Sequence, residues 1–268
     1  MLLKCIFTEF AKLKRYSVLW VGVAVVLCST LLAAIQSASE GGAIPYAVFS
    51  GNVIWNNFSL AFPFFIVLLG GFLIDREYTD DTLKDLLTVP VSFGQMLLSK
   101  LIVTGILTVL FGLLSFVSAV LAGLIILRCG GFSPAALGVS LVQLVGVAFF
   151  NFLAVSPLIA GFGRKRGAFF IGVGIAFFYG FCGIFMAGNG LPDVYPITAG
   201  LGIVGYTGQT GSGGTPLTGH PLTGCAVLAL MVGITLAIVA LPPSYDKAML
   251  PPKKAGRRKA KPRPHSAK

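Results

Sequence analysis

Charged residues are scarce in this sequence. Asp, Glu, Lys and Arg make up 11% of its 268 residues, against roughly 25% in a typical soluble domain. Hydrophobic residues make up 56%, and the mean hydropathy is +0.89. These values exclude both a water-soluble globule and a disordered chain. The few charges are unbalanced, with 20 Lys and Arg against 9 Asp and Glu. Such an excess is typical of proteins that bind nucleic acid or an anionic membrane surface, so the positions of the cations must decide between them.

Several chemical signatures are also missing. The sequence has no GxxxxGK[ST] motif, which excludes the phosphate-binding loop of an ATPase within this chain. Its two histidines, His220 and His265, are far apart, and its five cysteines show no CxxC spacing. We therefore expect no catalytic residue, metal or cofactor in the chain itself.

Long apolar runs dominate the sequence. A helix needs about 20 apolar residues to cross the hydrocarbon core of a bilayer, and six runs near or above that length contain no Asp, Glu, Lys or Arg. Pro63 and Pro157 lie inside the second and fourth runs, where we expect them to kink or loosen the helix. The runs predict an all-α, polytopic membrane protein with six transmembrane helices. They cover residues 17–36, 54–74, 101–127, 135–161, 168–188 and 222–241.

The cations alternate between the two sides of such a bundle. Nineteen of the 20 Lys and Arg residues fall on one side, and only Arg128 falls on the other. The positive-inside rule then places both termini in the cytoplasm, which is consistent with an even number of spans. Nine of these cations lie in the tail, residues 242–268, and its basic part, residues 253–268, has no aromatic residue to stack on bases. We interpret the tail as a disordered arm on the anionic inner leaflet and expect no nucleic-acid partner.

The first sixteen residues carry Leu3, Ile6, Phe7, Phe10 and Leu13 at helical spacing. Their charged neighbours fall largely on the other side of the helical wheel. The pattern predicts an amphipathic helix in the cytoplasmic interface. A simple positive anchor for the first span is the alternative.

The loop between the second and third spans holds five of the nine acids. Thr82 and Asp85 have the spacing of a capping box, and Leu83, Leu86 and Leu87 then form a short apolar stripe. Two interpretations remain open: a solvated loop whose charges keep it in the cytosol, or a short helix that docks a cytosolic partner.

The outer side is different. Its loop 189–221 is rich in glycine and is predicted to be a spacer. Asn56, Asn57, Phe62 and Phe65 near the outer part of the second span are candidates for a substrate path, from position and polarity alone.

The string R-E-Y-x-x-x-T-L-K-x-L-L-x-x-P-V-S…L-x-S-K-L-I, formed by residues 76–102, resembles the loop between helices two and three of ABC-2 type transporter permeases. The N-terminal EFAKLKRYSVLW and the Trp55-Asn56-Asn57 triplet are most similar to the lantibiotic-immunity and bacitracin-resistance branch. The chain departs from the family pattern at Asp81, where Gly or Asn is frequent, and at Phe93-Gly94, where Arg often follows P-V-S.

The resemblance implies a permease driven by a separate ABC ATPase subunit, in two copies, which would bind ATP and Mg²⁺. A second permease subunit, identical or homologous, would complete the pathway. The ATPase would bind a cytoplasmic coupling helix between helices two and three, and an antimicrobial peptide or other amphipathic or lipid-like substrate would leave a bacterial inner membrane. The residues this assigns to ATPase coupling are Arg76, Glu77, Thr82, Leu83, Leu86 and Leu87.

The sequence thus predicts a six-helix permease domain over residues 1–241 and a basic tail over 242–268. The chain is expected to be a transport subunit and not an enzyme. Two alternatives remain: a membrane anchor or sensor that recruits a cytosolic partner, and an intramembrane enzyme that acts on lipid.

Overall fold

The computed structural model describes residues 2–13, 16–39, 44–79, 92–165, 167–188, 193–208 and 220–241. Within these ranges every regular element is helical. The elements are α1 (Leu2–Leu13), α2 (Val18–Ser39), α3 (Tyr46–Asn56), the π-helical turn η1 (Asn57–Ala61), α4 (Phe62–Thr79), α6 (Phe93–Ile125), α7 (Pro134–Phe162), α8 (Phe169–Gly188), α9 (Pro196–Ile203) and α10 (Pro221–Ala240). The all-α prediction is confirmed.

Six helical segments are long and apolar enough to cross a membrane, as the hydropathy pattern predicts. They are α2, the continuous segment Tyr46–Thr79, α6, α7, α8 and α10. Large apolar side chains are exposed along their outer faces, including Trp20, Phe178 and Leu230. Exposed apolar surface on this scale is stable in lipid and not in water, so the chain is a multi-pass membrane protein.

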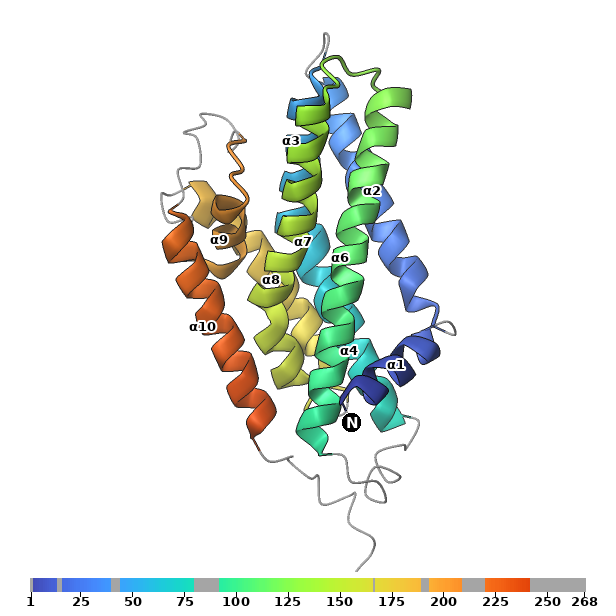
Figure 1. The fold of residues 1–268 in the computed structure, drawn as a ribbon, viewed down its shortest axis with the longest axis vertical. Coiled ribbons are helices and arrows are strands. Elements are labelled where there is room, and N and C mark those ends of the chain that lie inside the picture. The colour runs from blue at the N-terminus through green and yellow to red at the C-terminus, as the bar shows by residue number, and fades with distance from the viewer. Residues whose placement is uncertain are drawn as a thin grey trace, which may run out of the picture.

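Figure 1 shows α6 between α2 and α7, with α10 on the far side of α7. The helix α1 lies across the end of the bundle at which α4 ends and α6 begins. We call this end the α1 end. The helix α8 packs mainly against α4, which lies behind α6 in this view.

The second span is longer than the predicted run 54–74. Its helix begins at Tyr46 and ends at Thr79, and the turn Asn57–Ala61 is π-helical. Pro63 follows this turn and has no N–H to donate to the carbonyl of Ser59, four residues earlier. The sequence predicts a kinked or loosened helix at Pro63, and the structure has a π-helical turn directly before it. Such turns are a common local adjustment inside membrane helices. By contrast, α7 continues as a helix through Pro157.

The third span also begins earlier than the predicted run 101–127. Ser92 and Gln95 form a reciprocal capping box that starts α6 at Phe93. This cap places Lys100 two turns inside the helix. The predicted capping box at Thr82 and Asp85 lies outside the described residues, as does the tail 242–268.

The predicted spacer 189–221 contains an unexpected helix, so the prediction is wrong for residues 196–203. The helix α9 is buried from Pro196 to Leu201 and packs against α10 and α7. A Cβ on Gly200 would lie 2.7 Å from Cβ of Phe150, so glycine permits this close approach. The loop that follows α9 is tied to α3, because the hydroxyl of Tyr206 donates to the carbonyl of Gly51 at 3.0 Å.

Candidate functional site

Four charged side chains close a ring at the α1 end. Nζ of Lys100 lies 2.7 Å from Oε2 of Glu9 and 3.0 Å from Oε1 of Glu77. Nζ of Lys12 lies 3.1 Å from Oε1 of Glu9 and 2.9 Å from Oε1 of Glu77. Each carboxylate therefore binds both ammonium groups. We call Glu9, Lys12, Glu77 and Lys100 the charge ring.

The ring is largely removed from solvent. Only 1% of the Lys100 side chain and about a tenth or less of each glutamate side chain is exposed, whereas Lys12 is 38% exposed. Burial disfavours the charged form of Lys12, but its hydrogen bond to Glu77 and the charges of Glu9 and Glu77 outweigh this and raise its pKa above the usual value. Two cations and two anions give the ring a net charge of zero, which is what allows it to be buried.

Three helices supply the ring. Glu9 and Lys12 lie one turn apart on α1, Glu77 lies in the last turn of α4, and Lys100 lies near the start of α6. Since Glu77 and Lys100 flank residues 80–91 in the chain, their contact draws together the two helix ends from which that segment emerges.

The ring corrects the predicted orientation of α1. The wheel assigned Leu3 and Phe7 to one apolar face and Glu9 to the polar side. In the structure Leu3 and Phe7 are exposed, while Glu9 and Leu13 are buried. The reason is tertiary: the buried ammonium of Lys100 needs an anion, and Glu9 supplies it.

The predicted coupling residues are only partly described. Glu77 belongs to the charge ring. The guanidinium carbon of Arg76 lies 4.5 Å from the centroid of the aromatic side chain of Tyr16, a residue in the connection between α1 and α2. Such a cation–π contact fixes this connection against α4. The other four, Thr82, Leu83, Leu86 and Leu87, lie outside the described residues.

The candidate substrate-path residues are buried inside the single subunit. Asn57 is fully buried, and its amide bridges two helices: Oδ1 accepts from Ser29 of α2 at 2.7 Å, and Nδ2 donates to Ser115 of α6 at 2.7 Å. Asn56 donates to Oε1 of Gln36 at 3.0 Å. Both asparagines therefore join helices to one another in this conformation.

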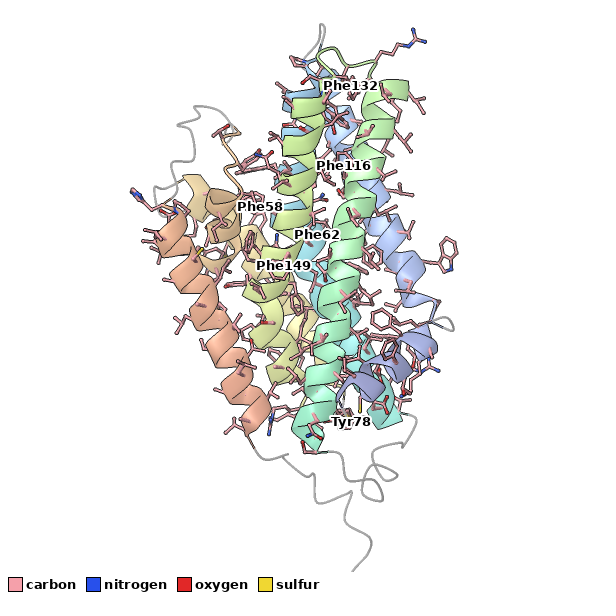
Figure 2. The ribbon with its side chains drawn as sticks, viewed as in Figure 1. Phe58, Phe62, Tyr78, Phe116, Phe132 and Phe149 are labelled. Atoms are coloured by element: carbon pink, nitrogen blue, oxygen red, sulfur yellow. The ribbon has the colours of Figure 1, made fainter. Side chains whose placement is uncertain are left out.

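Phe62 and Phe65 pack in the interior instead of lining an open surface. The ring of Phe65 meets Phe111 edge to face, with centroids 4.8 Å apart, and both rings close over Gly22. Figure 2 places the labelled Phe58 and Phe62 midway along the bundle and Tyr78 at the α1 end. A path past Phe65 requires α2 to separate from α4 and α6.

The sequence analysis did not predict that the four residues of the charge ring contact one another. It placed Lys100 outside the third span, and it placed Glu9 and Lys12 on a solvated face. The usable signal was the S-x-x-Q capping box at Ser92 and Gln95, which extends α6 backward and puts Lys100 within it.

The charged residues of this region connect three helices to one another. Across the part of the chain that the structure describes, no group of three or more His, Cys, Asp or Glu residues is placed to hold a metal ion. In the ring, both carboxylates are engaged by ammonium groups, an arrangement that fixes helix ends relative to one another.

These features define a class: a polytopic α-helical membrane protein whose amphipathic N-terminal helix is bound to the loop-bearing ends of its second and third spans. The family model of the ABC-2 family transporter protein matches residues 5–183, about two thirds of the chain. The chain belongs to this family. Its members are membrane-embedded transport subunits that generally work with a separate ABC ATPase and are not ATPases themselves. No curated protein sequence matches the chain.

Proposed function

We propose that this chain is the permease subunit of an ABC exporter in a bacterial inner membrane, with both termini in the cytoplasm. The observation that carries the proposal is the family match together with the position of the helix ends that flank residues 80–91: α4 ends and α6 begins at the end of the bundle that also holds α1. Two copies of an ATPase subunit would supply ATP and Mg²⁺, and a second permease subunit, identical or homologous, would complete the pathway.

The ATPase would dock on residues 80–91. The sequence pattern predicts an apolar face from Leu83, Leu86 and Leu87 and a polar rim from the three acids of this segment. Arg76 and Glu77 would act at its base, where the ring and Tyr16 fix the end of α4.

The proposed cargo is an amphipathic molecule that enters from the lipid, such as an antimicrobial peptide, in a role of self-immunity or resistance. The described interior suits this cargo for two reasons. The charges of the charge ring are paired with one another, and aromatic and amide side chains line the middle of the bundle. A path along Asn56, Asn57, Phe62 and Phe65 would open only when α2 moves away from α4 and α6.

Co-purification with a co-expressed ABC ATPase subunit tests the docking. The double variant Leu83→Glu and Leu86→Glu is expected to lose the ATPase while the permease still inserts and folds. The matched control is Val194→Glu, an exposed apolar residue between α8 and α9, which should retain the ATPase. Full ATPase binding by the double variant would reject the docking site.

Peptide sensitivity tests the cargo. Cells that express both subunits should survive amphipathic cationic peptides better than cells that express either subunit alone. ATPase binding without any ATP-dependent movement of substrate would favour a membrane anchor or sensor. Activity on lipid by this chain alone would favour an enzyme.

A further inference from the structure

The charge ring binds three helix ends that are far apart in the sequence. Glu9 and Glu77 are 68 residues apart, and Lys100 contacts both. Because Glu77 and Lys100 flank residues 80–91, a displacement of that segment acts on the ring from both sides. The ring thus joins the two helix ends through which such a displacement passes.

The ring resists opening one contact at a time. If Glu9 separated from Lys100, a nearly fully buried ammonium would lose one of its two anions. A buried charge without its partner is strongly unfavourable, so the ends of α1, α4 and α6 are expected to move as one unit. The cation–π contact of Arg76 with Tyr16 extends this unit to the start of α2.

Farther along, α2 meets α6 through weaker contacts. Thr30 shares a hydrogen bond with Ser118 at 2.8 Å, and Gly22 lies under the rings of Phe65 and Phe111. Hydrogen bonds between hydroxyls of neighbouring helices within membranes are weak on average. This part of the interface can rearrange while the ring stays closed.

We propose that Lys100 is a positioning residue for energy coupling: by binding Glu9 and Glu77 together, it makes α1, and through α1 the transmembrane helix α2, follow the ATPase-driven movement of residues 80–91. This inference rests on the proposed function. It predicts that a permease without the ring still binds its ATPase and hydrolyses ATP but no longer moves α1.

Distances between spin labels test the proposal without knowledge of the substrate. The first pair, Ala11→Cys with Thr79→Cys, measures the distance between α1 and α4. The second pair, Ala11→Cys with Leu222→Cys, measures the distance between α1 and the far end of α10. All three label positions, Ala11, Thr79 and Leu222, are exposed residues on described helices. The full complex with its ATPase is measured in nanodiscs, nucleotide-free and trapped with ATP, Mg²⁺ and vanadate. The native ring should keep the first distance constant while the second changes.

The test variant, called the neutral variant, removes the charges that α1 contributes to the ring, Glu9→Gln with Lys12→Met, and leaves Glu77 paired with Lys100. It leaves no unpaired buried charge, so it avoids the folding defect expected of Lys100→Met alone. Its ATPase binding and ATP hydrolysis should persist, the first distance should now change on trapping, and the change in the second should be lost. Lys165→Met, which removes an exposed cation at the same end of the bundle, should respond like the native chain.

The outcomes separate the two proposals. If the native chain responds to ATP and the neutral variant responds identically, the role of Lys100 is overturned while the proposed function stands. If the native complex binds no ATPase or shows no ATP-dependent change, the proposed function is overturned and this inference with it.

Discussion

Nζ of Lys100 lies 3.0 Å from Oε1 of Glu77, and this contact joins the start of α6 to the end of α4. The twelve residues 80–91 separate the two helices in the chain and lie outside the described residues. Both side chains are almost fully buried, so the pair is held in surroundings where a lone charge is costly. The contact explains how two helix ends with charged residues can stay inside the bundle.

Lys100→Met should destabilise the permease far more than Lys12→Met. The first leaves Glu9 and Glu77 with one partially exposed cation between them, and breaking a buried pair costs about 3–5 kcal/mol. The second removes a side chain that is 38% exposed, for which about 0.2–1 kcal/mol is expected. Thermal unfolding in detergent measures both, and equal losses would contradict the burial of Lys100.

Combining Lys100→Met with Glu9→Gln and Glu77→Gln should recover part of the stability that Lys100→Met loses. The reason is that these changes remove two buried carboxylates that have lost their buried cation. A further loss in this triple variant, measured in the same unfolding experiment, would show that packing and not charge dominates at the ring.

Two glycines of α8 make a matched pair for packing. A Cβ on Gly180 would overlap the carbonyl oxygen of Ser59 in the π turn, whereas a Cβ on Gly174 would meet nothing within 4 Å. Gly180→Ala should lower stability by about 1–3 kcal/mol. Gly174→Ala should be neutral or should raise it by up to about 1 kcal/mol through helix propensity. If Gly180→Ala were as stable as Gly174→Ala, the close contact between α8 and η1 would be refuted.

Asn57 offers a test of the polar connection between α2, η1 and α6. Asn57→Ala removes the hydrogen bonds to Ser29 and Ser115. A double-mutant cycle with Ser29→Ala should give a coupling free energy near 0.6 kcal/mol, with an upper bound of about 1.7 kcal/mol. Additive effects of the two changes would mean that the hydrogen bond contributes nothing to stability.

Cysteine labelling tests the orientation. Cys225 is exposed near the start of α10, and Cys5 lies on α1 at the opposite end of the bundle. With Cys225 as the only cysteine, an impermeant maleimide should label intact cells. With Cys5 as the only cysteine, it should label only lysed cells. The reverse pattern would place the termini outside.

Cys129 provides an internal control for that experiment. It follows α6 on the side predicted to be outer, but it is buried, and burial raises the pKa of its thiol. Because the thiolate is the reactive form, Cys129 should label much more slowly than Cys225 at neutral pH. Raising the pH of the reaction should narrow the difference.

The sequence by itself determined the class of this protein. Six apolar runs without charge predict six spans, since each must exceed the hydrocarbon thickness and no other structure satisfies its backbone in lipid. The loop string from Arg76 to Lys100 also indicated the family that the family model confirms. These are local properties, so they can be read from short stretches of chain.

Only the tertiary structure decided how the helix ends meet. The helical wheel of α1 placed Glu9 toward water, because a wheel contains no information about a cation 91 residues later. The burial of Glu9 depends on Lys100, that of Lys100 depends on Glu77, and the pairing of all three depends on the packing of α1, α4 and α6. The same holds for α9, whose glycine-rich sequence is typical of a spacer until Phe150 and α10 supply a surface against which it packs.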